Sequence, residues 1–74
     1  MQQFLETAVK GLVDHPDQVS VTPVERGGMI TYELRVAEGD AGKVIGKQGS
    51  MIQVLRNLLA VAGTKLGKRT AIEL

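Results

Sequence analysis

The sequence predicts a small α+β domain in which helices cover one face of a three-stranded sheet. Two segments have apolar residues at intervals of three and four, as in amphipathic helices, and three others alternate, as in strands. A Gly-Gly pair separates the first two alternating segments, as in a tight hairpin. With 43% apolar and 23% charged residues, the 74-residue chain has a globular composition. The expected element order is helix, strand, strand, short helix, long helix, strand.

The first helix is expected near the N-terminus, with an apolar stripe of Phe4, Leu5, Ala8, Val9, Leu12 and Val13. It should end at Asp14-His15, because a residue that precedes proline, here Pro16, is disfavoured in helical geometry. The only aromatic residues, Phe4 and Tyr32, occupy positions that these patterns assign to the core. Base stacking on exposed aromatic rings is therefore not expected.

Two strands should follow, one beginning at Val19 and one running from Ile30 to Val36, joined through Gly27-Gly28. Pro23 has no amide hydrogen to donate to a neighbouring strand. The first strand should therefore be bulged, or lie at a sheet edge, at that position.

The second half of the chain should hold two helices and a strand. A one-turn helix is expected from about Ala41 to Ile45, and a long helix from about Ser50 to Leu66. Gly67 can end the long helix. Residues 68–74 alternate and suit a short final strand.

The composition excludes several kinds of site. The chain has no cysteine, so it has no disulfide, thiolate zinc site or redox pair. His15 is expected to be a loop residue, and Asp14 and Asp17 near it lack further metal ligands. No pair of nucleophile and base is found. We therefore expect that the protein is not an enzyme and that it has no catalytic site, metal or cofactor.

The N-terminal segment lacks the basic flank and long apolar run of a signal peptide. No stretch approaches the roughly 20 apolar residues of a membrane span. We therefore expect a cytoplasmic protein without membrane insertion.

The charges are unevenly distributed along the chain. Residues 1–40 carry three basic and seven acidic side chains, a net −4, and residues 41–74 carry six basic and one acidic, a net +5. A basic face for an anionic partner would explain this split. Intermixing of the two halves in space would leave no such face, and the charges alone do not decide between these readings.

Residues 42–56 read GKVIGKQGSMIQVLR, with glycines at 42, 46 and 49 between two helical patterns. Glycine costs a helix interior roughly 1 kcal/mol relative to alanine, so these positions need a reason. The spacing excludes a P-loop, which has four residues between its glycines and Ser or Thr after its lysine. The dinucleotide-binding fingerprint is excluded too, because no strand runs directly into this loop.

What remains is a GxxG loop, Gly46-Lys47-Gln48-Gly49, between a short and a long helix. KH domains use this arrangement to clamp the backbone of about four nucleotides. Glycine lets a sugar-phosphate backbone approach the main chain, because no Cβ intervenes. The amides at the start of the long helix and the Lys47 ammonium favour a phosphate there.

The segment Asp40 to Gly49, followed by Ile52, Leu55 and Arg56, resembles the KH signature. The element order resembles the type II KH fold, so residues 1–74 are expected to form a single KH domain. The length and the Lys-Arg-x-x-x-Glu ending at residues 68–73 resemble the small free-standing bacterial KH proteins of the KhpA family.

The resemblance implies binding of single-stranded RNA, as an RNA chaperone or post-transcriptional regulator. It also implies pairing with a second copy or with a KhpB-type KH protein, and in some bacteria a link to cell-wall homeostasis and cell shape. The residues expected to contact RNA are Gly42, Lys43, Val44, Ile45, Gly46, Lys47, Gln48, Gly49, Ser50, Ile52 and Arg56. An aliphatic groove for bases would draw on Val44, Ile45, Ile52, Leu34 and Val36, for which core packing is the competing interpretation.

Two features leave alternatives open. Relatives often carry a basic residue directly after the loop, where this chain has Ser50, so a phosphate contact is missing. A KH fold that serves as a protein-protein adaptor with little RNA binding is therefore the alternative function. Lys68 and Arg69 either steer RNA or lie near the C-terminal carboxylate.

The apolar arc of the long helix covers about half its circumference, wider than the roughly 100° needed to pack on one sheet. Leu55, Leu59, Ala62 and Leu66 are expected to cover the sheet. That leaves Val54, Leu58 and Val61 at one edge, where exposed apolar side chains would form a dimer interface. The alternative is that the N-terminal helix covers this edge.

Overall fold

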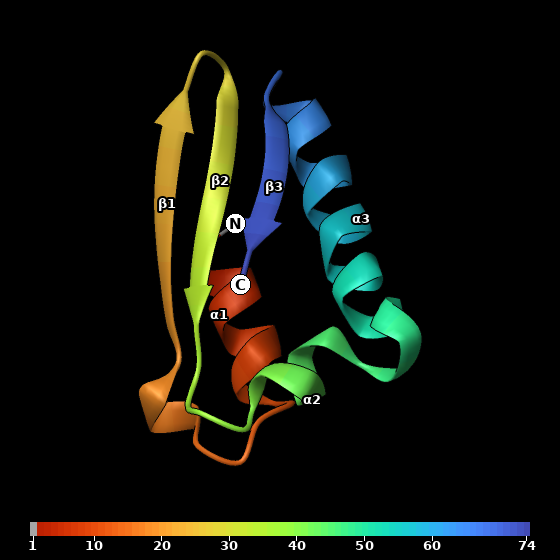
Figure 1. The fold of residues 1–74 in the computed structure, drawn as a ribbon. Coiled ribbons are helices and arrows are strands. Elements are labelled where there is room, and N and C mark those ends of the chain that lie inside the picture. The colour runs from red at the N-terminus through yellow and green to blue at the C-terminus, as the bar shows by residue number, and fades with distance from the viewer. Residues whose placement is uncertain (1) are drawn as a thin grey trace.

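The computed structural model describes residues 2–74, which form the expected order of elements (Figure 1). The helices are α1 (Gln2–Lys10), α2 (Ala41–Ile45) and α3 (Ser50–Lys65), and two 3₁₀ turns are η1 (Pro16–Gln18) and η2 (Lys47–Gly49). The strands are β1 (Ser20–Arg26), β2 (Met29–Arg35) and β3 (Arg69–Glu73).

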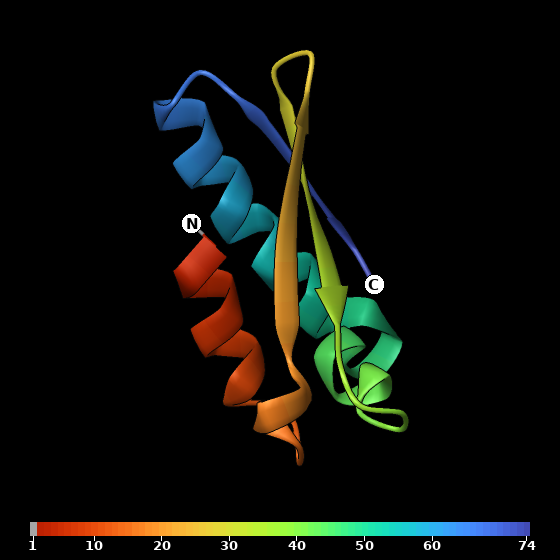
Figure 2. The same ribbon diagram turned by 90° about the vertical axis from the view of Figure 1, so that its left-hand side faces the viewer.

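The three strands form one mixed sheet in the order β1-β2-β3. Strands β1 and β2 pair antiparallel, with Ser20 opposite Arg35, and β3 runs parallel to β2, with Met29 opposite Arg69. The helices lie on one side of the sheet (Figure 2). The predicted α+β class, with helices on one face, is confirmed.

The hairpin between β1 and β2 follows the prediction. Gly27 and Gly28 have φ angles of 55° and 79°, the left-handed region that a two-residue type I′ turn requires at both positions. Pro23 lies opposite Tyr32 in an unbroken register. Strand β1 is therefore an edge strand without a bulge at the proline, the second of the two expected solutions.

The core lies between the sheet and the helices. Alternate strand residues point into it, which gives β2 its buried Ile30, Tyr32 and Leu34. The helices add Leu5 and Val9 from α1, Val44 from α2, and Ile52, Leu55 and Leu59 from α3. The opposite face of the sheet is not covered by helices and carries the polar residues that alternate with the buried ones along the strands.

Helix α3 ends in the way that Gly67 predicts. Gly67 has a φ of 71°, and its amide donates to the Thr64 carbonyl while the Lys68 amide donates to the Gly63 carbonyl. These two bonds form a Schellman motif, which turns the chain into β3. Gly63 is buried, and a Cβ there would lie 2.8 Å from the Lys68 carbonyl oxygen, so a larger residue would not fit without a shift of the main chain.

Three sequence expectations about α1 and α3 were wrong. Helix α1 ends at Lys10 rather than at Asp14, because Gly11 weakens the helix before proline acts. Phe4 is 47% exposed and Leu66 is 62% exposed, although both were assigned to buried stripes. Leu5 and Val9 occupy the sheet-facing side of α1, and Leu66 lies beyond the last residue of α3, where the chain already turns.

Candidate functional site

The loop between α2 and α3 is a tight turn with a defined backbone. The Gly46 amide closes α2 by donating to the Gly42 carbonyl at 2.9 Å, and the Gly49 amide donates to the Gly46 carbonyl at 3.2 Å. Lys47 and Gln48 lie at the tip, with exposed side chains. Helix α3 starts at Ser50, so the loop leads directly into the amides of its first turn.

The two loop glycines are required for different reasons. Gly46 has a φ of 78°, and a Cβ there would lie 2.6 Å from the Cβ of Met51 and 2.9 Å from its nitrogen. Gly49 has a similar φ of 77°, but a Cβ there would meet nothing within 4 Å. Packing against Met51 thus requires glycine at position 46. At position 49 the absence of a side chain leaves the main chain open to a ligand.

Alanine at the two glycines should separate these roles. Gly49→Ala should cost about 1–2 kcal/mol, the strain of a left-handed residue with a side chain. Gly46→Ala should cost more, because its φ of 78° and ψ of 175° lie in a region that essentially only glycine adopts. Overpacking against Met51 should add about 1–3 kcal/mol. Urea unfolding followed by circular dichroism measures both variants, and equal losses would contradict the distinction.

Gln48 is the one non-glycine residue among 2–74 with a positive φ, at 56°. This conformation costs of order 1 kcal/mol or more for a residue with a side chain. The flanking glycines and the start of α3 hold it in place. Strained residues of this kind cluster at binding sites, so the conformation of Gln48 makes the loop tip a candidate for one.

Lys43, on α2 four residues before Lys47, is not a free cation. Its ammonium forms a hydrogen-bonded ion pair with Asp14 and lies 3.7 Å from a carboxylate oxygen of Asp40. The hydrogen bond to Asp14 raises the pKa of Lys43, and the same bond lowers the pKa of Asp14. The other Asp40 oxygen accepts a hydrogen bond from the His15 amide at 3.1 Å.

The remaining residues of the expected RNA-binding set fall into two groups. Gly42, Ser50 and Arg56 are exposed, and Ile45 on α2 is partly exposed beside the loop. Val44 and Ile52 are buried in the core. Their side chains position α2 and α3 against the sheet and so act on the loop through the backbone.

An apolar hollow of about 580 Å³ opens beside α2. Three of the five aliphatic residues considered for a base-binding groove line it, namely Leu34, Val36 and Ile45. Leu74 and Ala41 also line it, and both were missed. The only signal for Leu74 was its place at the end of the alternating C-terminal segment.

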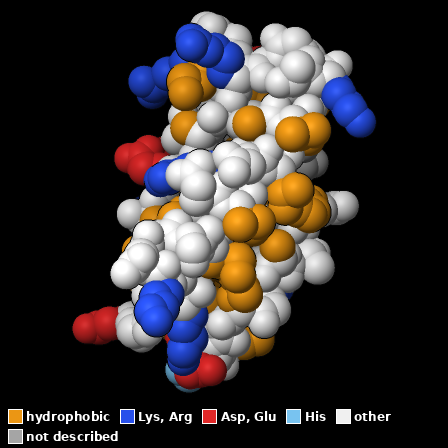
Figure 3. Space-filling view, turned by 90° about the vertical axis from the view of Figure 1, so that its right-hand side faces the viewer, with side chains coloured by type: hydrophobic (Ala, Val, Ile, Leu, Met, Phe, Trp, Pro, Cys, Tyr) orange, Lys and Arg blue, Asp and Glu red, His pale blue; other side chains and the backbone are white. Residues whose placement is uncertain are grey.

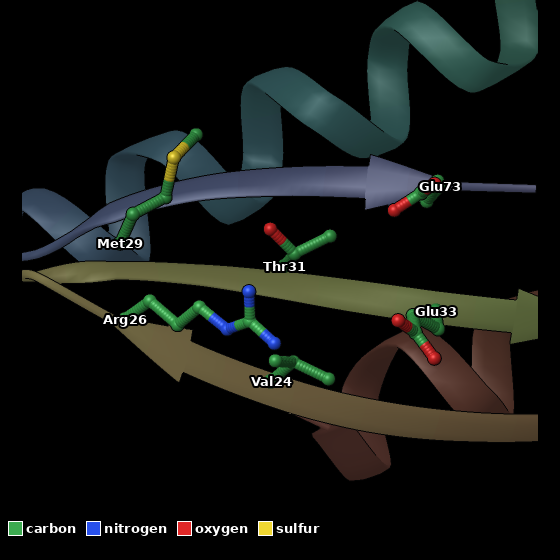
Figure 4. A pocket seen from close by; sticks show the side chains of 6 residues that line it. All are labelled: Val24, Arg26, Met29, Thr31, Glu33 and Glu73. Carbon is green, nitrogen blue, oxygen red and sulfur yellow. The ribbon is translucent and has the colours of Figure 1, made fainter.

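A second hollow of about 310 Å³ lies on the open face of the sheet (Figure 4). Glu33 and Glu73 are register partners there, and the Arg26 side chain extends along the strands toward Val24 and Thr31. Among residues 2–74, no group of His, Cys, Asp or Glu is arranged to hold a metal ion.

The outer face of α3 carries the residues expected at a dimer interface. Val54, Leu58 and Val61 are 50%, 48% and 61% exposed. Apolar side chains form a band along the side of the molecule that α3 occupies (Figure 3). Helix α1 packs mainly against β1 and leaves these three residues uncovered, so the alternative of an intramolecular cover does not apply.

The basic residues near the C-terminus lie away from the loop. The turn from α3 into β3 is at the opposite end of α3 from the turn that follows α2 (Figure 1). Lys68 is paired there with Glu25 of β1, and the Arg69 amide donates to the Gly28 carbonyl. The charge split along the sequence therefore does not produce one continuous basic face. Within residues 2–74, no helix has the length and hydropathy to cross a membrane.

The chain is similar to known proteins along its whole length. A family model described as "KhpA/KhpB, KH domain" matches residues 2–74. The RNA-binding protein KhpA of Clostridium acetobutylicum is 46% identical over 74 residues, which cover 100% of this chain and 99% of the relative. KhpA proteins of Listeria monocytogenes and Aquifex aeolicus are 40% and 42% identical over 100% of this chain, and 97% and 94% of the relatives are covered. No solved structure matches the chain.

Proposed function

The chain belongs to the KhpA/KhpB family of KH domains, and from this premise we propose that it binds single-stranded RNA through the Gly46–Gly49 loop. The observation that supports this proposal is the position of the loop: its exposed tip carries Lys47, it leads directly into the first turn of α3, and a side chain at Gly49 would meet nothing within 4 Å. A ribose-phosphate backbone can reach the main chain at this point. The relatives are named as RNA-binding proteins, and the protein is not an enzyme.

The loop offers a phosphate two kinds of positive charge. The first amides of α3 carry the partial charge of a helix N-terminus, and Lys47 adds a full charge at the exposed tip. Bases that follow the clamped backbone would lie against the apolar hollow, where Ile45 and Leu74 are partly exposed. With Tyr32 buried and no aromatic residue in the hollow, base recognition would rely on aliphatic contact.

A salt series on the parent and on Lys47→Gln tests this function. Fluorescence anisotropy with a short labelled RNA of mixed sequence should give an affinity that falls with salt. Loss of the Lys47 charge should reduce the slope of log K against log salt by roughly 0.7, the value for one phosphate contact on a single strand. Binding that is independent of salt, or equal slopes for the two proteins, would contradict the proposal.

We also propose that the protein pairs through α3, with a second copy or with a KhpB-type KH protein. The uncovered side chains of Val54, Leu58 and Val61 support this pairing. A dimer would carry two loops and so would contact RNA at two places. This arrangement suits an RNA chaperone or a post-transcriptional regulator in the cytoplasm. A contribution to cell-wall homeostasis and cell shape would follow through the KhpB-type partner.

A protein-protein adaptor with little RNA binding is the second candidate function. Two observations favour it: Lys43 is already paired with carboxylates, and Ser50 supplies no charge after the loop. In that case the apolar face of α3 would carry the function and the loop would be idle. The salt series separates the two candidates, because an idle loop gives no Lys47-dependent slope.

A further inference from the structure

A cluster of three charged side chains surrounds the start of α2, one turn before the loop. Lys43 contributes the ammonium, and Asp14 and Asp40 contribute two carboxylates. Asp14 comes from the connection between α1 and η1, 29 residues away in sequence. Two negative charges thus face the one positive charge nearest to the loop on its α2 side.

The two carboxylates differ in how firmly they are held. The Asp40 side chain is only 3% exposed, and its second oxygen is fixed by the His15 amide. The Asp14 side chain is 67% exposed, and among residues 2–74 its carboxylate pairs with Lys43 alone. Asp40 is therefore a permanent part of the fold, whereas Asp14 can leave Lys43 by a side-chain rotation.

We propose that Asp14 is an internal competitor of RNA phosphate for Lys43. In the free protein the Asp14 carboxylate occupies the ammonium, and a phosphate of the bound strand replaces it. This inference rests on the proposed function, since it requires that a sugar-phosphate backbone crosses the α2–α3 loop. Lys43 then becomes a phosphate contact only at the expense of an existing ion pair.

The size of the effect follows from the exposure of the pair. Exposed ion pairs are weak, and breaking one lowers an equilibrium constant by a factor of up to about five. Asp14 therefore moderates RNA affinity without blocking it. The Asp14 carboxylate also offsets the positive charge of Lys43, which lowers the attraction of this surface for non-specific anions.

The test compares Asp14→Asn with Asp17→Asn, which removes a carboxylate of the same charge three residues away. Asp17 is exposed in η1, and within residues 2–74 its side chain has no hydrogen bond or ion pair. Both substitutions keep the side-chain shape. Lys43→Gln and the double variant Asp14→Asn/Lys43→Gln complete a cycle that isolates action through Lys43.

Affinities for a short fluorescein-labelled single-stranded RNA are measured at low salt, with circular dichroism to verify folding. Asp14→Asn should bind up to about fivefold more tightly than the parent, and Asp17→Asn should change little. The gain should vanish in the Lys43→Gln background. Equal gains from the two carboxylate variants, or a gain that survives without Lys43, would overturn the proposal in favour of a general charge effect.

The outcome separates this inference from the function on which it rests. If the parent binds RNA with a Lys47-dependent salt slope and Asp14→Asn binds like the parent, only the competitor role is wrong. If the parent shows no Lys47-dependent binding, the proposed function fails, and the competitor role fails with it.

Discussion

Replacing Lys47 and Gln48 together with aspartate should weaken binding to single-stranded RNA about a hundredfold or more while the domain stays folded. The variant loses the one cation at the loop tip and sets two negative charges against the RNA backbone. Like charges at an interface cost several kcal/mol, and each 1.4 kcal/mol corresponds to about tenfold in affinity. The comparison is made by anisotropy with the parent at the same salt concentration.

The fold should survive because both side chains are exposed and both loop glycines remain. Gln48 has a φ of 56°, and aspartate tolerates this left-handed region better than glutamine does. Circular dichroism and urea unfolding verify this expectation. The variant is therefore informative about binding rather than about folding.

A matched control makes the same change in net charge elsewhere. Arg26→Asp combined with Gln3→Asp alters two exposed positions, one next to the hairpin at the far end of the sheet and one on α1. This control should keep most of the parent affinity. If the loop variant, shown to be folded, binds RNA as tightly as the control, the loop is not the binding site.

Val61→Asp should convert a dimer into a folded monomer. Val61 is 61% exposed and belongs to the apolar face that it shares with Val54 and Leu58. A buried, unpaired carboxylate at a two-fold interface costs several kcal/mol, and symmetry applies the cost twice. The dimer dissociation constant should therefore rise by at least about a hundredfold.

The same substitution should leave the isolated domain stable, because the side chain already faces solvent in the monomer. Ala60→Asp is the matched control, as Ala60 is an exposed neighbour on α3 and lies about 100° away around the helix. Light scattering gives the mass and circular dichroism the fold. A parent that is monomeric at high concentration would exclude self-pairing, and an unfolded Val61→Asp would show that this residue supports the fold instead.

The sequence determined the elements of this domain and their order, because these depend on local properties. The Gly27-Gly28 turn, the end of α3 at Gly67 and the position of the GxxG loop all follow from backbone conformations that glycine alone adopts readily. Alternation along β2 predicted its buried residues, since successive side chains point to opposite faces of a sheet.

The partners of individual side chains were decided only by the tertiary structure. Asp14 and Lys43 are 29 residues apart, and no local pattern relates them. The two loop glycines have the same φ, and only the position of Met51 makes one of them a packing requirement. The spacing of apolar residues indicates which face of a helix or strand is apolar, but burial depends on what packs against that face. For this reason Phe4 and Leu66 are exposed, although their spacing is that of a core.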